Sequence, residues 1–143
     1  MDNLSVAQRR ATMRAVRSKD TAPEMIVRRL VHALGRRYRL HVQGLPGCPD
    51  LVFPLRRKAI FVHGCFWHGH SCPAGLNVPR SNERYWGAKL ERNKARDERN
   101  KRTLRALGWR VLTIWECQLK RRPDAVAVRL AKFLVKERAT ASS

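Results

Sequence analysis

Hydrophobic residues recur at helical spacing after a clear helix-start signal near the beginning of the chain. Thr21 can cap a helix, Pro23 falls in its first turn, and Glu24 follows the cap by three residues, as in a capping box. The hydrophobic positions continue to Leu34, and Gly35 ends the pattern. The spacing therefore predicts a helix that begins at Thr21 and stops at Gly35.

Three further stretches have helical character. A shorter helix is expected over roughly Ser5–Arg17. A long polar stretch from about Ser81 to Leu107, closed by Gly108, predicts a second long helix. An amphipathic pattern with a proline in its first turn predicts a last helix over Pro123–Arg138.

Strand-like runs lie between these helices. Three short runs, Tyr38–Val42, Asp50–Phe53 and Ala59–His63, follow the first secure helix, and Pro54 with a basic turn suits a hairpin between the second and third. Trp109–Trp115 has the composition of a buried strand. A loop rich in glycine, cysteine and histidine occupies residues 64–79.

The order helix, strands, helix, strand, helix is typical of an α/β domain. We expect a three-layer α/β/α arrangement in which helices cover both faces of a mixed central sheet. No repeat or low-complexity segment divides the chain, so residues 1–143 are expected to form a single domain with flexible ends at about 1–8 and 138–143.

Charge narrows the choice of partner. The 143 residues contain 31 Lys and Arg against 11 Asp and Glu, a formal net charge of +20, and 43% are hydrophobic. A chain with that hydrophobic content can bury a core, which excludes a disordered basic tail. Such a charge favours a nucleic-acid partner, with an anionic membrane surface as the weaker alternative.

Location is also constrained by the sequence. The chain has no apolar run approaching the ~20 residues needed to span a bilayer, and its first ten residues lack the apolar region of a secretory signal. We therefore expect a soluble, cytoplasmic protein.

The segment His63–Cys72 concentrates metal-binding chemistry, with three of the five histidines and two of the four cysteines. Structural zinc is held by four cysteine or histidine ligands, and one turn here can supply three of them. The set indicated is Cys65, His70, Cys72 and Cys117. Two buried thiols beside a polar loop, or a redox pair, are the alternatives, and Cys48 is expected to be a free thiol.

Two histidines in this segment are not needed for zinc. His63 and His68 can give or take a proton near neutral pH, which makes them candidates for catalysis. The alternative is that they support the zinc ligands or face solvent.

Carboxylates are few, so their settings are informative. Asp50 follows a proline at the start of an apolar strand, where a carboxylate is costly unless it binds a cation such as Mg²⁺ or a hydrogen-bond donor. A turn aspartate that caps its own backbone is the alternative.

The helix-capping role explains the position of Glu24 without any part in catalysis. Polar and aromatic residues share one face of the predicted long helix: Trp86, Lys89, Asn93 and Asp97.

Three motifs together resemble those of the very-short-patch repair endonucleases, bacterial enzymes that nick T:G mismatches. They are Leu45–Asp50, Phe61–His68, and Gly108–Leu112 with the Trp115–Cys117 tripeptide. The resemblance covers the chain from about Met13 to Cys117. It implies a restriction-endonuclease-like fold in which a histidine replaces the usual lysine.

The resemblance also implies roles for individual residues. Asp50 would bind catalytic Mg²⁺ directly together with the carbonyl of Val62, where the best-known member has threonine. Glu24 and His63 would contact this ion through water molecules. His68 would act as the base, oriented by Asp97. The zinc ligands implied are Cys65, His70, Cys72 and Cys117, the set already indicated, and Gly69 stands where a further histidine can occur.

DNA recognition follows from the same resemblance. Phe66, Trp67 and Trp86 would intercalate beside the mismatch, a step that is least costly where pairing is already weak. Lys89 and Asn93 would read the wobble pair, and Met13 would contact the minor-groove side.

The function that these implications predict is a Mg²⁺-dependent endonuclease with a structural zinc. It would nick 5′ to the T of a T:G mismatch left by deamination of 5-methylcytosine, acting on double-stranded DNA as a monomer at the bacterial nucleoid, with downstream mismatch-repair proteins as further partners. A zinc-containing basic module that binds nucleic acid without chemistry, or another nuclease of the same fold, are the alternatives.

Overall fold

The computed structural model describes residues 21–65, 68, 70, 72 and 83–135. The helix expected over 5–17 lies outside the described residues, as do Met13, Phe66, Trp67 and Gly69. No helix in the described part is both long and apolar enough to cross a membrane.

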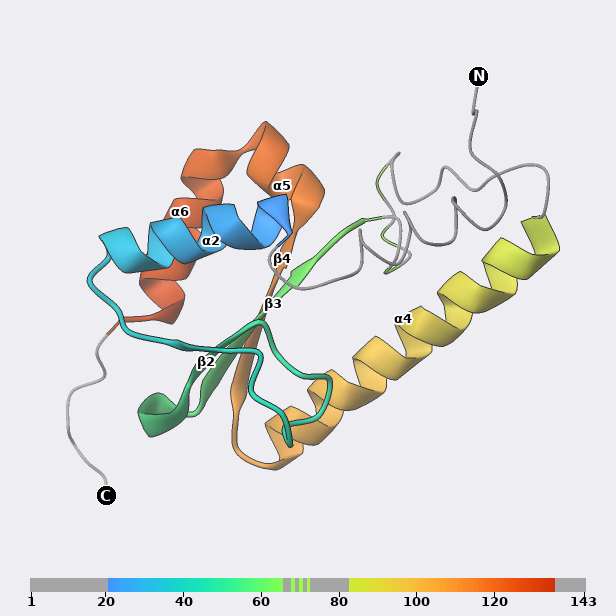
Figure 1. The fold of residues 1–143 in the computed structure, drawn as a ribbon, viewed down its shortest axis with the longest axis horizontal. Coiled ribbons are helices and arrows are strands. Elements are labelled where there is room, and N and C mark those ends of the chain that lie inside the picture. Colours follow the sequence, from blue (N-terminus) through green and yellow to red (C-terminus); the bar gives the residue numbers. More distant parts are fainter. Residues whose placement is uncertain (1–20, 66–67, 69, 71, 73–82, 136–143) are drawn as a thin grey trace.

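A mixed four-stranded sheet forms the centre of the fold, with strand order β1-β2-β3-β4. The β1/β2 and β2/β3 pairs are antiparallel, and β3/β4 is parallel. Helices α2, α5 and α6 lie on one side of the sheet and α4 on the other (Figure 1). The elements are α2 (Ala22–Ala33), β1 (Arg39–Leu40), β2 (Leu51–Phe53), a 3₁₀ turn (Pro54–Arg56), β3 (Lys58–His63), α4 (Glu83–Ala106), β4 (Arg110–Trp115), α5 (Glu116–Arg121) and α6 (Pro123–Phe133). The expected α/β class with a mixed sheet is confirmed.

Four elements differ from the sequence prediction. The first strand pairs only over Arg39–Leu40, because His41 adopts a left-handed backbone conformation with φ 47° that interrupts the strand. Helix α5 was not predicted, since six residues are too few to show a periodic pattern. Helix α6 ends at Phe133, earlier than expected, and the fourth strand is only partly buried.

The larger core lies between the sheet and helices α2, α5 and α6. In α2, the residues Glu24, Val27 and Val31 form one buried stripe at positions i, i+3 and i+7. Val27 and Val31 pack with Ile60 of β3 and Ile114 of β4 in this core. The carboxylate of Glu24 therefore stands on the same helix face as the core.

The opposite face of the sheet packs against α4. Side chains alternate between the two faces of a strand, so Ala59, Phe61 and His63 of β3 face away from Ile60. Leu104 of α4 is fully buried on this side, and Leu90 is nearly so. Helix α4 spans about 36 Å at 1.5 Å per residue, and its N-terminal part extends beyond the sheet (Figure 1).

A glycine lets the loop before β2 pack closely against α4 and the adjacent face of β3. Gly47 has φ 78°, and a Cβ placed there would lie 3.1 Å from the Cβ of Asn100 and 3.1 Å from Cε1 of Phe61. Both the backbone conformation and the available space therefore favour glycine. By contrast, a Cβ at Gly87 in α4 would meet nothing within 4 Å.

These two glycines give a matched pair of stability predictions. Gly47→Ala should lower the free energy of unfolding by more than about 1 kcal/mol, because it adds both backbone strain and steric overlap. Gly87→Ala should raise it by up to about 1 kcal/mol, because alanine favours the helix. Chemical denaturation of both variants checks this, and a Gly47→Ala protein as stable as the parent would contradict it.

Candidate active site and metal centre

A pocket of about 530 Å³ opens where β2 begins and β3 ends. The start of α2, the loop before β2, the end of β3 and the middle of α4 all contribute to its lining. Five predicted catalytic residues line it: Glu24, Asp50, His63, His68 and Asp97. Glu24 and Asp97, which are 73 positions apart in sequence, thus line the same pocket.

Hydrogen bonds fix Asp50 at the position just before β2 begins. Its backbone N–H donates to the carbonyl of Ile60 at 3.0 Å, and its Oδ2 accepts the N–H of Val62 at 2.7 Å. Because N–H and C=O groups alternate in direction along a strand, the carbonyl of Val62 faces the same side as that of Ile60, toward Asp50. The turn-capping alternative for Asp50 is not what its hydrogen bonds show.

Glu24 turns its carboxylate toward Asp50. Its backbone N–H donates to Oγ1 of Thr21 at 3.4 Å, which is one half of the expected capping box. Among the described residues, its carboxylate accepts from Nε2 of His41, at 2.9 and 3.0 Å for the two oxygens, and from Arg28 at 3.4 Å. Glu24 is only 2% exposed, so helix capping alone does not explain it.

His41 is a site residue that the sequence reasoning missed. Its Nε2 lies 4.0 Å from Oδ1 of Asp50, and its backbone N–H donates to the carbonyl of Asp50. The strand register could have indicated it. Leu40 of β1 pairs with Leu51 of β2, so the residue that follows β1, His41, comes opposite Asp50.

The environment of Asp50 favours a bound cation. Burial, and secondly the neighbouring charge of Glu24, raise the pKa of Asp50 to about 7, against the opposing hydrogen bond from Val62. Two adjacent carboxylates with a backbone carbonyl are oxygen donors of the kind Mg²⁺ and Mn²⁺ prefer. The donor set therefore fits a hard divalent ion.

A second group of side chains in the pocket consists of His63, His68 and Asp97. The rings of His63 and His68 stack with centroids 3.7 Å apart, and Nδ1 of His68 lies 2.5 Å from Oδ2 of Asp97. His63 is 4% exposed, and its Nε2 has no hydrogen-bond partner among the described residues. Burial, then the charges of His68 and Lys101, lower the pKa of His63 to about 2, so His63 is neutral at pH 7.

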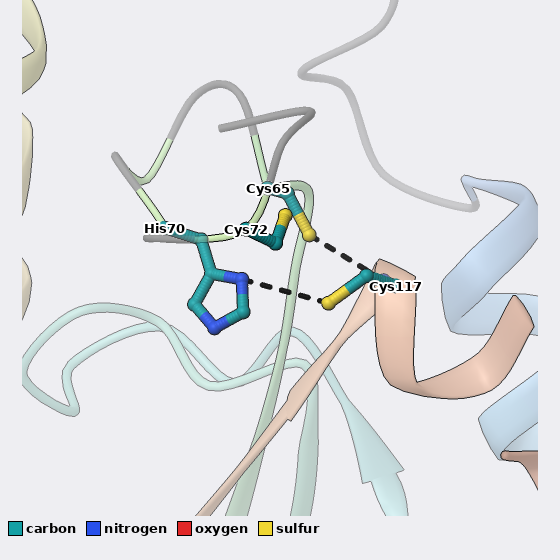
Figure 2. A group of neighbouring side chains, drawn as sticks. All are labelled: Cys65, His70, Cys72 and Cys117. Carbon is teal, nitrogen blue, oxygen red and sulfur yellow. Dashed lines mark hydrogen bonds between the residues drawn. The ribbon is translucent and has the colours of Figure 1, made fainter. Parts of the chain in front are cut away.

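The four predicted zinc ligands converge beside this pocket (Figure 2). Nδ1 of His70 lies 3.5 Å from Sγ of Cys117, whose backbone N–H donates to Sγ of Cys65 at 3.4 Å. Tetrahedral zinc with ordinary bond lengths separates a nitrogen and a sulfur ligand by about 3.6 Å. The four side chains therefore fit a zinc ion, whereas Cys48 is an exposed free thiol elsewhere.

The predicted DNA-contacting residues that the structure describes lie on α4. Asn93 is buried, lines the pocket and accepts a hydrogen bond from Arg96 at 3.2 Å. The Nζ of Lys89 stands 5.6 Å from the centroid of the Trp86 ring, outside the pocket lining. Arg96, which the sequence reasoning missed, also lines the pocket, one residue before Asp97.

Comparison with known proteins connects this geometry to a family. The family model described as DNA mismatch endonuclease Vsr matches residues 1–74. The type II nicking enzyme V.XorIIP of Xanthomonas oryzae pv. oryzae is 54% identical over 118 residues, which cover 82% of this chain and 86% of the relative. The DNA mismatch endonuclease Vsr of Escherichia coli K12 is 40% identical over 139 residues, 94% of this chain and 88% of the relative.

These matches identify the chain as a DNA endonuclease, and its mixed sheet between helices is consistent with a restriction-endonuclease-like fold. The chain belongs to the Vsr family of DNA mismatch endonucleases.

The cysteine cluster predicts one zinc ion per chain. Cys72→Ser should lower the zinc content measured by plasma mass spectrometry and reduce the thermal midpoint by roughly 10 °C, because zinc binding contributes folding free energy. Cys48→Ser is the matched control and should change neither quantity. Protein that holds no zinc, or a Cys72→Ser variant with full zinc content, would contradict the assignment.

The raised pKa of Asp50 predicts proton release when a divalent ion binds. A metal needs the ionised carboxylate, so zinc-loaded protein titrated with Mg²⁺ should release about nine-tenths of a proton per ion at pH 6 and about one-tenth at pH 8. The apparent affinity should fall as the pH drops below about 7. Calorimetry in buffers of different ionisation enthalpy measures this release, and equal values at both pH values would refute the prediction.

Proposed function

We propose that this endonuclease is Mg²⁺-dependent and nicks one strand of duplex DNA 5′ to the T of a T:G mismatch. The observation that carries the proposal is the convergence of the Glu24–Asp50 carboxylates with the His68–Asp97 pair in one pocket. The two relatives compared above, a type II nicking enzyme and a DNA mismatch endonuclease, support the proposal.

In this proposal the carboxylate of Asp50 and the carbonyl of Val62 would hold the metal ion, and Glu24 and His63 would contact it through water. A bound ion would neutralise charge at the scissile phosphate. The neutral imidazole of His63 adds no positive charge that would compete with a cation. Its Nε2, which has no hydrogen-bond partner among the described residues, would hydrogen-bond to a metal-bound water molecule.

His68 is the proposed general base. Its Nδ1 is engaged by Asp97, which orients the ring and leaves Nε2 to accept the proton of the attacking water. As the water oxygen bonds to phosphorus, the bond from phosphorus to the leaving oxygen breaks, and that oxygen takes a proton from solvent. Asp97 stabilises the imidazolium that forms.

Arg96 is the proposed phosphate contact from the protein. Of the described residues that line the pocket, it is the only lysine or arginine. Its bond to Asn93 engages one N–H group of the guanidinium and leaves others available. A guanidinium matches phosphate geometry and neutralises charge that develops on the phosphoryl oxygens.

Helix α4 is the proposed recognition element. It carries nine Lys and Arg against four Asp and Glu, which suits a phosphate backbone. We propose that Trp86 intercalates together with Phe66 and Trp67, that Lys89 and Asn93 read the wobble pair, and that Met13 contacts the minor-groove side. The pocket-lining position of Asn93 would couple base reading to the scissile phosphate.

The biological substrate would be the T:G pair that deamination of 5-methylcytosine leaves in bacterial DNA. The nick would start very-short-patch repair, with downstream repair proteins acting on the product. We further propose that the chain acts as a single endonuclease domain over residues 1–143 and as a monomer.

A nicking assay tests the proposal. A panel of duplexes that differ in the bases flanking one T:G pair, each with its C:G counterpart, should show Mg²⁺-dependent nicking 5′ to the T in at least one context. C:G duplexes should be nicked at least on the order of a hundredfold more slowly, because an intact pair resists distortion.

Asp50→Asn should reduce this activity by a factor on the order of a thousand or more, because it removes the charged metal ligand. Asp124→Asn, at an exposed position in the first turn of α6, is the matched control and should retain activity. Equal nicking of T:G and C:G duplexes, or full activity in Asp50→Asn, would refute the proposal.

A further inference from the structure

We propose that His41 is a direct ligand in the catalytic metal centre and that this centre therefore binds Mn²⁺ more tightly than Mg²⁺. The inference concerns the ion of the proposed nuclease and so rests on that proposed function. It adds an imidazole nitrogen to a site otherwise built from oxygen.

The distances suit one octahedral ion. Ligands at about 2.1 Å from a metal are about 3.0 Å apart when adjacent and about 4.2 Å apart when opposite. Nε2 of His41 lies 2.9 Å from Oε2 of Glu24 and 4.0 Å from Oδ1 of Asp50. One ligand atom from each of the three residues lies within 4.8 Å of the other two. A single cation bound directly by His41 and Asp50 would therefore lie within reach of the Glu24 carboxylate, which would contact it through water.

The backbone directs His41 into this site. It is a non-glycine residue at φ 47°, a conformation that costs on the order of 1 kcal/mol or more and persists only where its surroundings hold it. Its backbone N–H is bonded to the carbonyl of Asp50, so the turn is fixed to the strand that carries the metal-binding carboxylate. The side chain is 13% exposed, and its Nε2 faces the two carboxylates.

The donor set decides the metal preference. Mg²⁺ selects oxygen ligands and gains little from imidazole, whereas nitrogen donors raise the affinity of first-row transition ions. Mn²⁺ shares the oxygen preference of Mg²⁺, and as a first-row transition ion it gains more from an imidazole ligand. An all-oxygen site also favours Mn²⁺ moderately, because Mg²⁺ gives up its water molecules reluctantly. The part of the preference that depends on the His41 imidazole therefore separates a ligand from a hydrogen bond that only positions Glu24.

Metal titration without DNA tests the inference. Zinc-loaded protein should bind Mn²⁺ at least on the order of tenfold more tightly than Mg²⁺. His41→Gln keeps an N–H donor for Glu24 but loses the imidazole, so it should weaken Mn²⁺ binding by on the order of tenfold while changing Mg²⁺ binding less than about twofold. His32→Gln, at an exposed position in the last turn of α2, is the matched control and should change neither affinity.

A spectroscopic measurement tests directly whether an imidazole coordinates the ion. Pulsed electron paramagnetic resonance of the protein with one equivalent of Mn²⁺ should show ¹⁴N coupling from a coordinated imidazole, and His41→Gln should remove it. Absence of this coupling in the parent protein, or its persistence in His41→Gln, would overturn the inference. Equal weakening of Mg²⁺ and Mn²⁺ binding would also overturn it, because His41 would then act only through Glu24.

The two proposals can fail separately. These measurements need no substrate, so a protein that nicks no mismatch could still bind Mn²⁺ through His41. Conversely, Mg²⁺-dependent nicking of T:G duplexes by a protein with no preference for Mn²⁺ would leave the proposed function intact and refute the role of His41 alone.

Discussion

The two pairings of β3, parallel with β4 and antiparallel with β2, are the constraint on which the two candidate metal sites depend. The β3/β4 ladder is continuous from Lys58 opposite Arg110 to His63 opposite Trp115. Because parallel strands end at the same edge, the residues that follow them are brought together, and Cys65 meets Cys117 there. On its other edge the same β3 strand presents the N–H of Val62 to Asp50. One strand thus sets the relative position of the carboxylates, the imidazoles and the thiols.

Aromatic stacking joins the zinc ligands to the catalytic imidazoles. The Trp115 ring stacks on His70 at 4.1 Å between centroids and meets His63 edge-on at 5.2 Å, and His63 in turn stacks on His68. His68 also lies between Cys65 and His70 in sequence, so the segment that holds the proposed base is flanked by two of the predicted zinc ligands. A zinc ion bound there would limit how far the base can move from Asp97.

The sequence predicted most of what depends on local pattern and residue chemistry. Helix α2, the long α4, the main strands and the convergence of the cysteines follow from caps, periodicity and metal-ligand types. It did not predict α5, which is too short for periodicity, or the strand break at His41, which comes from a backbone conformation. The partnership of His41 with Glu24 was missed because it depends on tertiary packing across 17 residues of separation.

The position of Glu24 makes one half of the active site inseparable from the core. Its carboxylate shares a helix face with Val27 and Val31, so any change in the size of those side chains shifts the helix and moves the carboxylate with it. His68, in contrast, lies between two residues of the cysteine and histidine cluster, Cys65 and His70. The carboxylate side of the pocket can therefore change only in step with the hydrophobic packing of the protein, and the imidazole side only in step with the side chains of that cluster.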